Sequence, residues 1–90
     1  MNGLELIAKE RKEQIEKHGR TIALDFAQNN KGQLAYAAVS ILEEPLNWRE
    51  LRRPANWDQA IWLKMCKKSY EDRLIYSGAF IASEIDRINH

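Results

Sequence analysis

The stretch Ser69–Asn89, SYEDRLIYSGAFIASEIDRIN, decides the fold that this sequence predicts. Apolar and small residues recur along it at helical spacing, which predicts one continuous helix from about Tyr70 to Asn89. Ser69 and Asp72 resemble a capping box at the start of that helix, with Asp in place of the usual Glu. The spacing defines one main packing stripe, which consists of Leu74, Gly78, Ile81, Ala82, Ile85 and Ile88.

Three more helices are predicted N-terminal to this stretch, over about residues 4–18, 31–43 and 57–65. Pro45 ends the second of them, because the residue before a proline is pushed out of helical geometry. Asn29 or Asn30 is expected to cap its start. Residues 1–90 therefore read as a single all-α domain, a small bundle of three main helices and one short helix.

Small residues on two helices predict a close helix pair. Gly78, Ala79 and Ala82 are expected to face Ala35 and Ala38, so that the backbones of the two helices approach closely. Other apolar residues on the same two helices point away from the main stripes, and a helix that is apolar on two sides is sandwiched or lies at an interface. We therefore expect a homo-oligomer whose interface includes Tyr36, Val39, Tyr76 and Phe80.

Composition excludes several classes of protein. The chain is 44% hydrophobic and 30% charged, which is typical of a folded domain rather than a disordered one. Its net charge of +1 argues against binding to long nucleic acid. Cys66 is the single cysteine, and no Cys/His set has zinc-ligand spacing, so we expect no metal and no cofactor. With no signal peptide and no long apolar run, the sequence predicts a cytoplasmic protein without a membrane partner.

The segment Leu46–Ser69 holds all three tryptophans of the chain and six basic residues against two acidic ones. Indole faces beside guanidinium and ammonium groups suit a small anion that carries a stackable ring, and a nucleotide is such a molecule. Tryptophans in a small domain also serve as core or interface anchors, and surface arginines are usually solvated. The candidate ligand residues of this segment are Trp48, Arg49, Arg52, Arg53, Trp57, Trp62 and Lys64.

Arg11 lies within the apolar stripe of the first predicted helix, where a charge is costly unless it is paired. One interpretation is a buried ion pair, for example with Asp25 or Asp72. The other is an arginine that binds an anion in a pocket between helices. Gln14 and Asp25 are then candidate polar readers of a base or ribose.

Enzyme motifs for phosphate loops, serine nucleophiles and zinc hydrolysis are absent, so no catalytic residue is assigned. One enzyme class remains as an alternative, the small all-α Mg²⁺-dependent nucleoside triphosphate pyrophosphohydrolases of the MazG type. Glu10, Glu13 and Glu16 match the first half of their carboxylate pattern, although Glu13 and Glu16 are expected on the solvent side of the helix. No E-x-x-D follows for the second half, so any such enzyme would be degenerate.

A family resemblance connects several of these residues. Glu10-Arg11-x-x-Gln14-Ile15, Gly19-x-Thr21, Gly32-Gln33-Leu34-Ala35-x-Ala37-Ala38 and the ending Gly78–Ile88 resemble a set of small phage and prophage proteins. Their pattern is roughly E-R-x-x-Q-I, G-[W/Y]-T, G-E-L-A-x-A-A and G-A-L-I-x-A-E-I-x-R-L. The chain departs from it at Arg20, where an aromatic residue is usual, and at Gln33, where Glu is common.

Small oligomeric phage proteins of this size include sponges that sequester the cyclic-nucleotide signals of bacterial defence systems such as CBASS and Thoeris. By that analogy the leading hypothesis is a phage-type protein that binds a signalling nucleotide without turning it over, at or near a subunit interface. A third hypothesis is a module that binds a host protein, with the tryptophans as hot spots on an exposed patch.

Overall fold

A computed structural model describes residues 1–18, without the His18 side chain, and residues 27–89. Five helices lie in these ranges, and the same residues contain no strand. The helices are α1 (Gly3–His18), α3 (Gln33–Ser40), α4 (Leu46–Leu51), α5 (Gln59–Cys66) and α6 (Tyr70–Ile88). The predicted all-α fold is confirmed. Asp25 lies outside the described residues.

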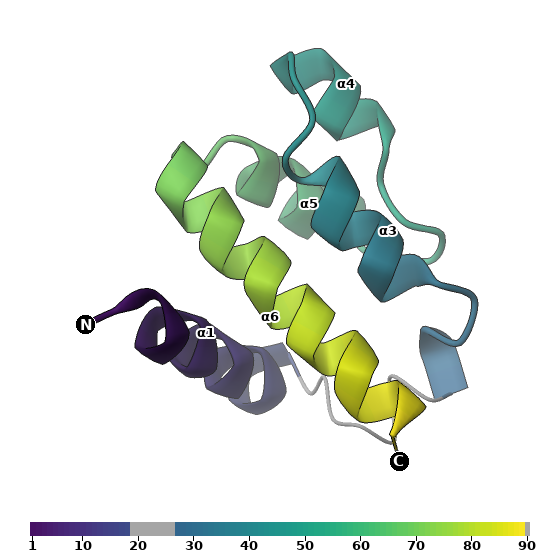
Figure 1. The fold of residues 1–90 in the computed structure, drawn as a ribbon. Helices are drawn as coiled ribbons and strands as arrows, with labels where there is room; N and C mark the ends of the chain where they lie inside the picture. Colours follow the sequence, from purple (N-terminus) through teal and green to yellow (C-terminus); the bar gives the residue numbers. More distant parts are fainter. Residues whose placement is uncertain (19–26, 90) are drawn as a thin grey trace.

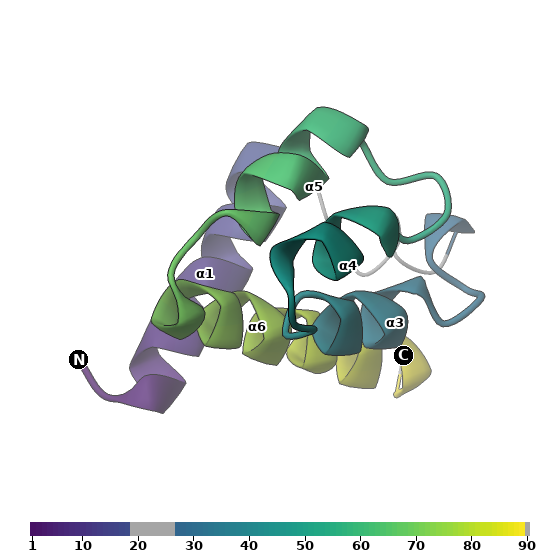
Figure 2. The same cartoon turned by 90° about the horizontal axis from the view of Figure 1, so that it is seen from above.

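The long helix α6 is the centre of the molecule. α1 and α3 lie on either side of it, and α4 and α5 lie together on one side of the layer that these helices form (Figures 1 and 2). The predicted cap is confirmed, because the Ser69 side chain accepts a hydrogen bond from the Asp72 backbone N–H at 3.1 Å. Asp58 caps α5 in the same way by accepting from the Ile61 N–H at 2.9 Å.

The predicted helix over residues 31–43 is shorter than expected. α3 ends at Ser40, five residues before Pro45, and tighter turns follow in which Leu42 and Glu43 donate to the carbonyls of Val39 and Ser40. The asparagine cap was wrong, because the N-cap residue is Gly32 at φ 81°, a left-handed conformation that favours glycine. Asn29 instead accepts a hydrogen bond from Trp57 Nε1.

The core lies between α3, α5 and α6. Its buried apolar members are Leu34, Ala37, Ala38, Ile41, Trp62, Cys66 and Phe80. Trp57 packs edge-on against two of them, with ring centroids 5.2 Å from Phe80 and 6.0 Å from Trp62. Trp62 is thus a core anchor, and its Nε1 donates to the Arg49 carbonyl at 2.9 Å.

The prediction of which side of α6 faces the core was wrong. Phe80 is buried in the core and Tyr76 packs against it, so neither lies on an open outer face of the protomer. The expected packing stripe is instead largely exposed at Leu74, Ile81, Ile85 and Ile88. Periodicity locates an apolar stripe but cannot say which of two stripes meets the neighbouring helices.

The close helix approach also differs from the prediction. Gly78 lies against α1 rather than α3, and a Cβ added there would come within 2.5 Å of Ile7 Cδ1. Contact with α3 comes instead through Ser77, whose hydroxyl donates to the Ala38 carbonyl at 2.8 Å. Tyr36 and Val39, the other two predicted interface residues, are exposed on α3.

Candidate functional site

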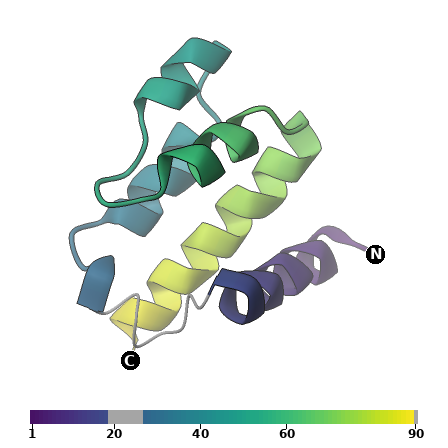
Figure 3. The same cartoon turned by 180° about the vertical axis from the view of Figure 1, so that it is seen from behind.

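A cleft of about 1170 Å³ lies between α1, α5 and α6, and residues 27–33 and 56–58 complete its wall. Figure 3 shows the molecule from the side on which α5 lies in front of α3, with α1 beside α6. The cleft is lined mostly by polar side chains around an aromatic floor. Its charged members are Glu10, Glu13, Lys17, Lys31, Asp58, Lys64 and Lys68, and its amides are Gln14, Gln28, Asn29, Asn30, Gln33 and Asn56.

Aromatic residues from α5, α6 and the preceding loop form the floor. Trp57, Trp62, Tyr76 and Phe80 all line the cleft. Trp62 and Phe80 are almost fully buried, whereas Trp57 and Tyr76 are half-buried. The Trp57 ring is held by its hydrogen bond to Asn29 Oδ1 at 2.9 Å. Trp57 and Tyr76 are therefore the rings that a flat ligand would meet.

Gln14 contributes an unusual polar group to the α1 wall. Its side chain is buried, and its Nε2 donates to Glu10 Oε2 at 3.2 Å. That bond leaves Oε1 as the free end of the amide, and this buried oxygen has no hydrogen-bond partner among the described residues. A buried carbonyl oxygen without a donor is destabilising. A ligand N–H in the cleft would satisfy it once the Gln14 amide turns this oxygen toward the cleft.

Two carboxylates stand beside Gln14 on the same wall. Glu10 and Glu13 both line the cleft, and Glu13, which was expected on the solvent side of the helix, is half-buried there. Burial raises the pKa of the Glu10 carboxyl; the Gln14 hydrogen bond lowers it, and the neighbouring Glu13 raises it further. No group of three or more His, Cys, Asp or Glu within residues 1–18 and 27–89 is placed to hold a metal ion.

Lysines supply the positive charge of the cleft. Lys17, Lys31, Lys64 and Lys68 line it from three different segments, and Lys64 was predicted as a ligand residue. Lys64 and Lys68 lie one turn apart at the end of α5 and both are exposed. Lys67, between them in sequence, does not line the cleft. Flexible ammonium groups at an opening suit phosphate oxygens.

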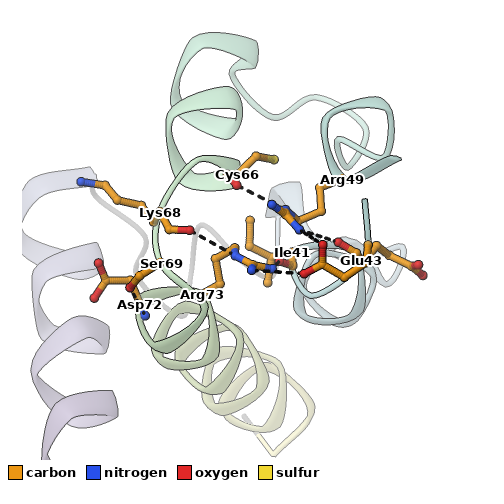
Figure 4. Close-up of polar contacts among 9 residues, drawn as sticks. Ile41, Glu43, Arg49, Cys66, Lys68, Ser69, Asp72 and Arg73 are labelled. Carbon is orange, nitrogen blue, oxygen red and sulfur yellow. Dashed lines mark hydrogen bonds and ion pairs between the residues drawn. The ribbon is translucent and has the colours of Figure 1, made fainter. Parts of the chain in front are cut away.

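Arg49, a predicted ligand residue, is instead a buried structural group (Figure 4). Its Nε donates to the Cys66 carbonyl at 3.2 Å, and its Nη1 donates to the Glu43 carbonyl at 2.7 Å. The same Nη1 lies 3.1 Å from Glu44 Oε2. These contacts join α4 to the ends of α3 and α5 and account for most of the guanidinium donors.

Arg73 on α6 is a second buried structural arginine, and it was not among the predicted site residues. Its Nε donates to the Lys68 carbonyl at 3.2 Å and its Nη1 to the Ile41 carbonyl at 3.1 Å, while Nη2 lies 3.4 Å from Glu44 Oε1 (Figure 4). Glu44 thus bridges both arginines, and we call Glu44, Arg49 and Arg73 the arginine clamp. A signal was present in the sequence, because Arg73 lies on the same side of α6 as Tyr76 and Phe80.

The remaining predicted arginines also lie away from the cleft. Arg11 is buried, and its Nη2 lies 3.8 Å from Asp86 Oδ2 of α6, so the ion-pair interpretation gains a partner other than the two expected ones. Arg52 lies over the exposed Trp48 ring at 5.5 Å and pairs with Glu43. Arg53 donates to the Trp57 carbonyl. None of them, and not Trp48, is among the residues that line the cleft.

Comparisons with protein-family models, with curated proteins and with solved structures find no match. Among the helices of the described ranges, none is long and apolar enough to cross a membrane. The cleft therefore has to be interpreted from its own residues.

Proposed function

We propose that the cleft binds a nucleotide and releases it unchanged. The observation that carries the proposal is Gln14 in the cleft wall, whose buried Oε1 has no donor among the described residues and would meet one by turning into the cleft. The exocyclic amino group of adenine, guanine or cytosine offers such a donor. Half-buried Trp57 and Tyr76 supply faces for the base, and the lysines at the opening supply charge for phosphate.

A more specific function is proposed from the resemblance to small phage proteins. The protein is proposed to be a phage-type, cytoplasmic homo-oligomer that sequesters a signalling nucleotide, such as a cyclic nucleotide of a bacterial defence system. Binding without turnover is part of the proposal, and within residues 1–18 and 27–89 no group of three carboxylates around Glu10 and Glu13 is placed to hold a metal ion. The ligand residues of the proposal are now Gln14, Trp57, Tyr76, Lys64 and Lys68.

The test is a titration monitored by tryptophan fluorescence, with mononucleotides, triphosphates, cyclic dinucleotides and cyclic ADP-ribose isomers. Saturable binding, followed by chromatographic recovery of the intact ligand after heat release, supports sequestration. The double variant Lys64→Ala/Lys68→Ala is expected to weaken binding about 100-fold or more, since two lost bonds to charged groups at about 1.5 kcal/mol or more each remove about 3 kcal/mol or more. Lys67→Ala is the matched control and leaves affinity unchanged. No response to any nucleotide overturns the proposal.

A second candidate, a pyrophosphohydrolase, is favoured by one observation: Glu10 and Glu13 both line the cleft. Two carboxylates on adjacent turns can contribute ligands to Mg²⁺. The same titration in the presence of Mg²⁺ separates the candidates. Conversion of a triphosphate to a monophosphate, abolished by Glu10→Gln, supports the enzyme.

The third hypothesis, a protein-binding module, required an exposed patch of tryptophans. Trp48 is exposed, but Trp57 is half-buried and Trp62 belongs to the core. The three rings therefore form no common exposed patch, and we do not carry this function forward.

A further inference from the structure

One face of α6 carries an apolar stripe that the described residues leave largely exposed. Leu74, Ile81, Ile85 and Ile88 are 41%, 49%, 52% and 66% exposed. Their spacing places them on one side of the helix over about 20 Å of its length. The stripe contains no charged residue, and of its two other members Gly78 is covered by Ile7 of α1 and Ala82 is half-buried.

The helices on either side of α6 also carry exposed apolar residues. Leu4 and Ile15 of α1 are 81% and 38% exposed, and Tyr36 and Val39 of α3 are 46% and 65% exposed. Figure 2 shows α4 and α5 together on one side of α6, and the four large stripe residues stay 41–66% exposed beside them. Together the exposed fractions of the α6 stripe and these flanking residues correspond to roughly 800 Å², which is the area that each partner buries in a stable protein–protein interface. The largest apolar patch of a monomer is usually smaller.

The pattern of the stripe fits a copy of itself. Ile81 lies at its middle, seven residues from both Leu74 and Ile88. An antiparallel second α6 related by a twofold axis at Ile81 brings Leu74 opposite the partner's Ile88 and Ile81 opposite the partner's Ile81. Such an isologous contact closes on itself and leaves no apolar end unpaired. Absence of charge at its centre is typical of interface cores.

We propose that a second copy of this chain covers the α6 stripe and makes the protein a twofold homodimer. This inference rests on the homo-oligomer that forms part of the proposed function. The interface it assigns differs from the one predicted from the sequence, which included Tyr76 and Phe80. Tyr76 and Phe80 lie on the opposite side of α6, toward the cleft. Both clefts of the dimer therefore stay open, and each protomer binds its own ligand.

The test measures molar mass by light scattering during size-exclusion chromatography of the full chain. We expect twice the protomer mass for the natural sequence. Ile81→Glu places a charge at the twofold axis and is expected to weaken association about 100-fold or more, giving a protomer-sized particle. Leu51→Glu is the matched control: Leu51 is 82% exposed on α4, away from the stripe, and its variant stays dimeric. Circular dichroism verifies that both variants are folded.

Should Ile81→Glu fail to fold, cross-linking provides the second measurement. Ile81→Cys in a Cys66→Ala background is expected to form a disulfide-linked dimer on mild oxidation, whereas Leu51→Cys in the same background does not. A monomeric natural protein at 100 µM, or a folded Ile81→Glu variant that stays dimeric, overturns the interface. Nucleotide titration of the monomeric variant is independent: unchanged affinity per protomer is expected, and loss of binding overturns the claim that each cleft is complete in one protomer.

Discussion

The arginine clamp and the cleft both gather polar and charged groups, but they differ in how those groups are satisfied. In the clamp, Arg49 and Arg73 are buried and donate to four backbone carbonyls and to Glu44. In the cleft, the lysines are solvated and a buried carbonyl oxygen of Gln14 has no donor among the described residues. A satisfied buried cation stabilises the fold, whereas an unsatisfied buried acceptor beside solvated cations suits a ligand.

The largest expected effect is on the clamp. Arg73→Ala removes the donors to the Ile41 and Lys68 carbonyls and the ion pair with Glu44, and a buried acceptor left without its donor costs about 1–3 kcal/mol. We therefore expect the free energy of unfolding to fall by about 2–4 kcal/mol in urea denaturation. Arg52→Ala is the control, because its half-exposed ion pair with Glu43 should contribute less than about 1 kcal/mol. Equal losses in the two variants would show that the clamp does not stabilise the fold.

The second-largest expected effect is on nucleotide affinity in the cleft, with the stability of the fold nearly unchanged. Gln14→Leu removes the unsatisfied oxygen together with the donor to Glu10, so the free energy of unfolding should change by less than about 1 kcal/mol. Nucleotide affinity, measured by isothermal calorimetry, should fall about 10-fold or more through loss of the acceptor. Gln59→Leu, a substitution of an exposed amide outside the cleft, should leave affinity as it was. Undiminished binding by Gln14→Leu would remove Gln14 from the site.

The contrast between clamp and cleft could be predicted only in part from the sequence. Helical periodicity gives α1, α5 and α6 nearly to their ends, because these helices carry long apolar patterns or clear caps. α4 was missed, since six residues are too few to show a period. Of the predicted ligand residues, Gln14, Trp57, Trp62 and Lys64 line the cleft, whereas Arg49 is buried outside it.

The failure at Arg49 has a physical cause. Charge and composition are properties of a segment, but burial depends on contacts far apart in sequence, such as the 17 positions between Arg49 and Cys66. The same cause hides Arg73, whose Ile41 acceptor lies 32 positions away. The choice between two apolar stripes on α6 likewise depends on where α3 and α5 dock, and no local pattern encodes that.

A smaller effect concerns the carboxylate wall of the cleft. Burial raises the pKa of Glu10 in the folded protein above its ordinary value of 4.5. Below pH 4.5 the group is protonated in both the folded and the unfolded state, so Glu10→Gln should change stability little there. As the pH rises through the raised folded pKa, the natural protein ionises a partly buried carboxyl, and the variant becomes the more stable of the two. By pH 7 the gain in free energy of unfolding should be less than about 1 kcal/mol, measured by urea denaturation at both pH values.

Glu10→Gln also distinguishes the two candidate functions of the cleft. Removing a negative charge from the cleft wall should tighten binding of an anionic nucleotide a few-fold if the site only sequesters. A Mg²⁺-dependent hydrolase would instead lose its turnover. Glu16→Gln, on the exposed side of α1, is the control and should affect neither stability nor binding.

The smallest expected signal is the reactivity of Cys66, which reports on the clamp from inside the core. Burial raises the pKa of its thiol from 9.0 to about 11, and the nearby Arg49 only partly opposes this. At pH 8 the native protein should therefore show no measurable reaction with a thiol reagent within minutes, because the thiolate is the reactive form. Arg73→Ala should make Cys66 reactive at a rate that follows its loss of stability, whereas Gln14→Leu should leave it protected. Rapid labelling of the native chain would mean that the clamp opens without global unfolding, and the clamp would then resemble the cleft in its access to solvent.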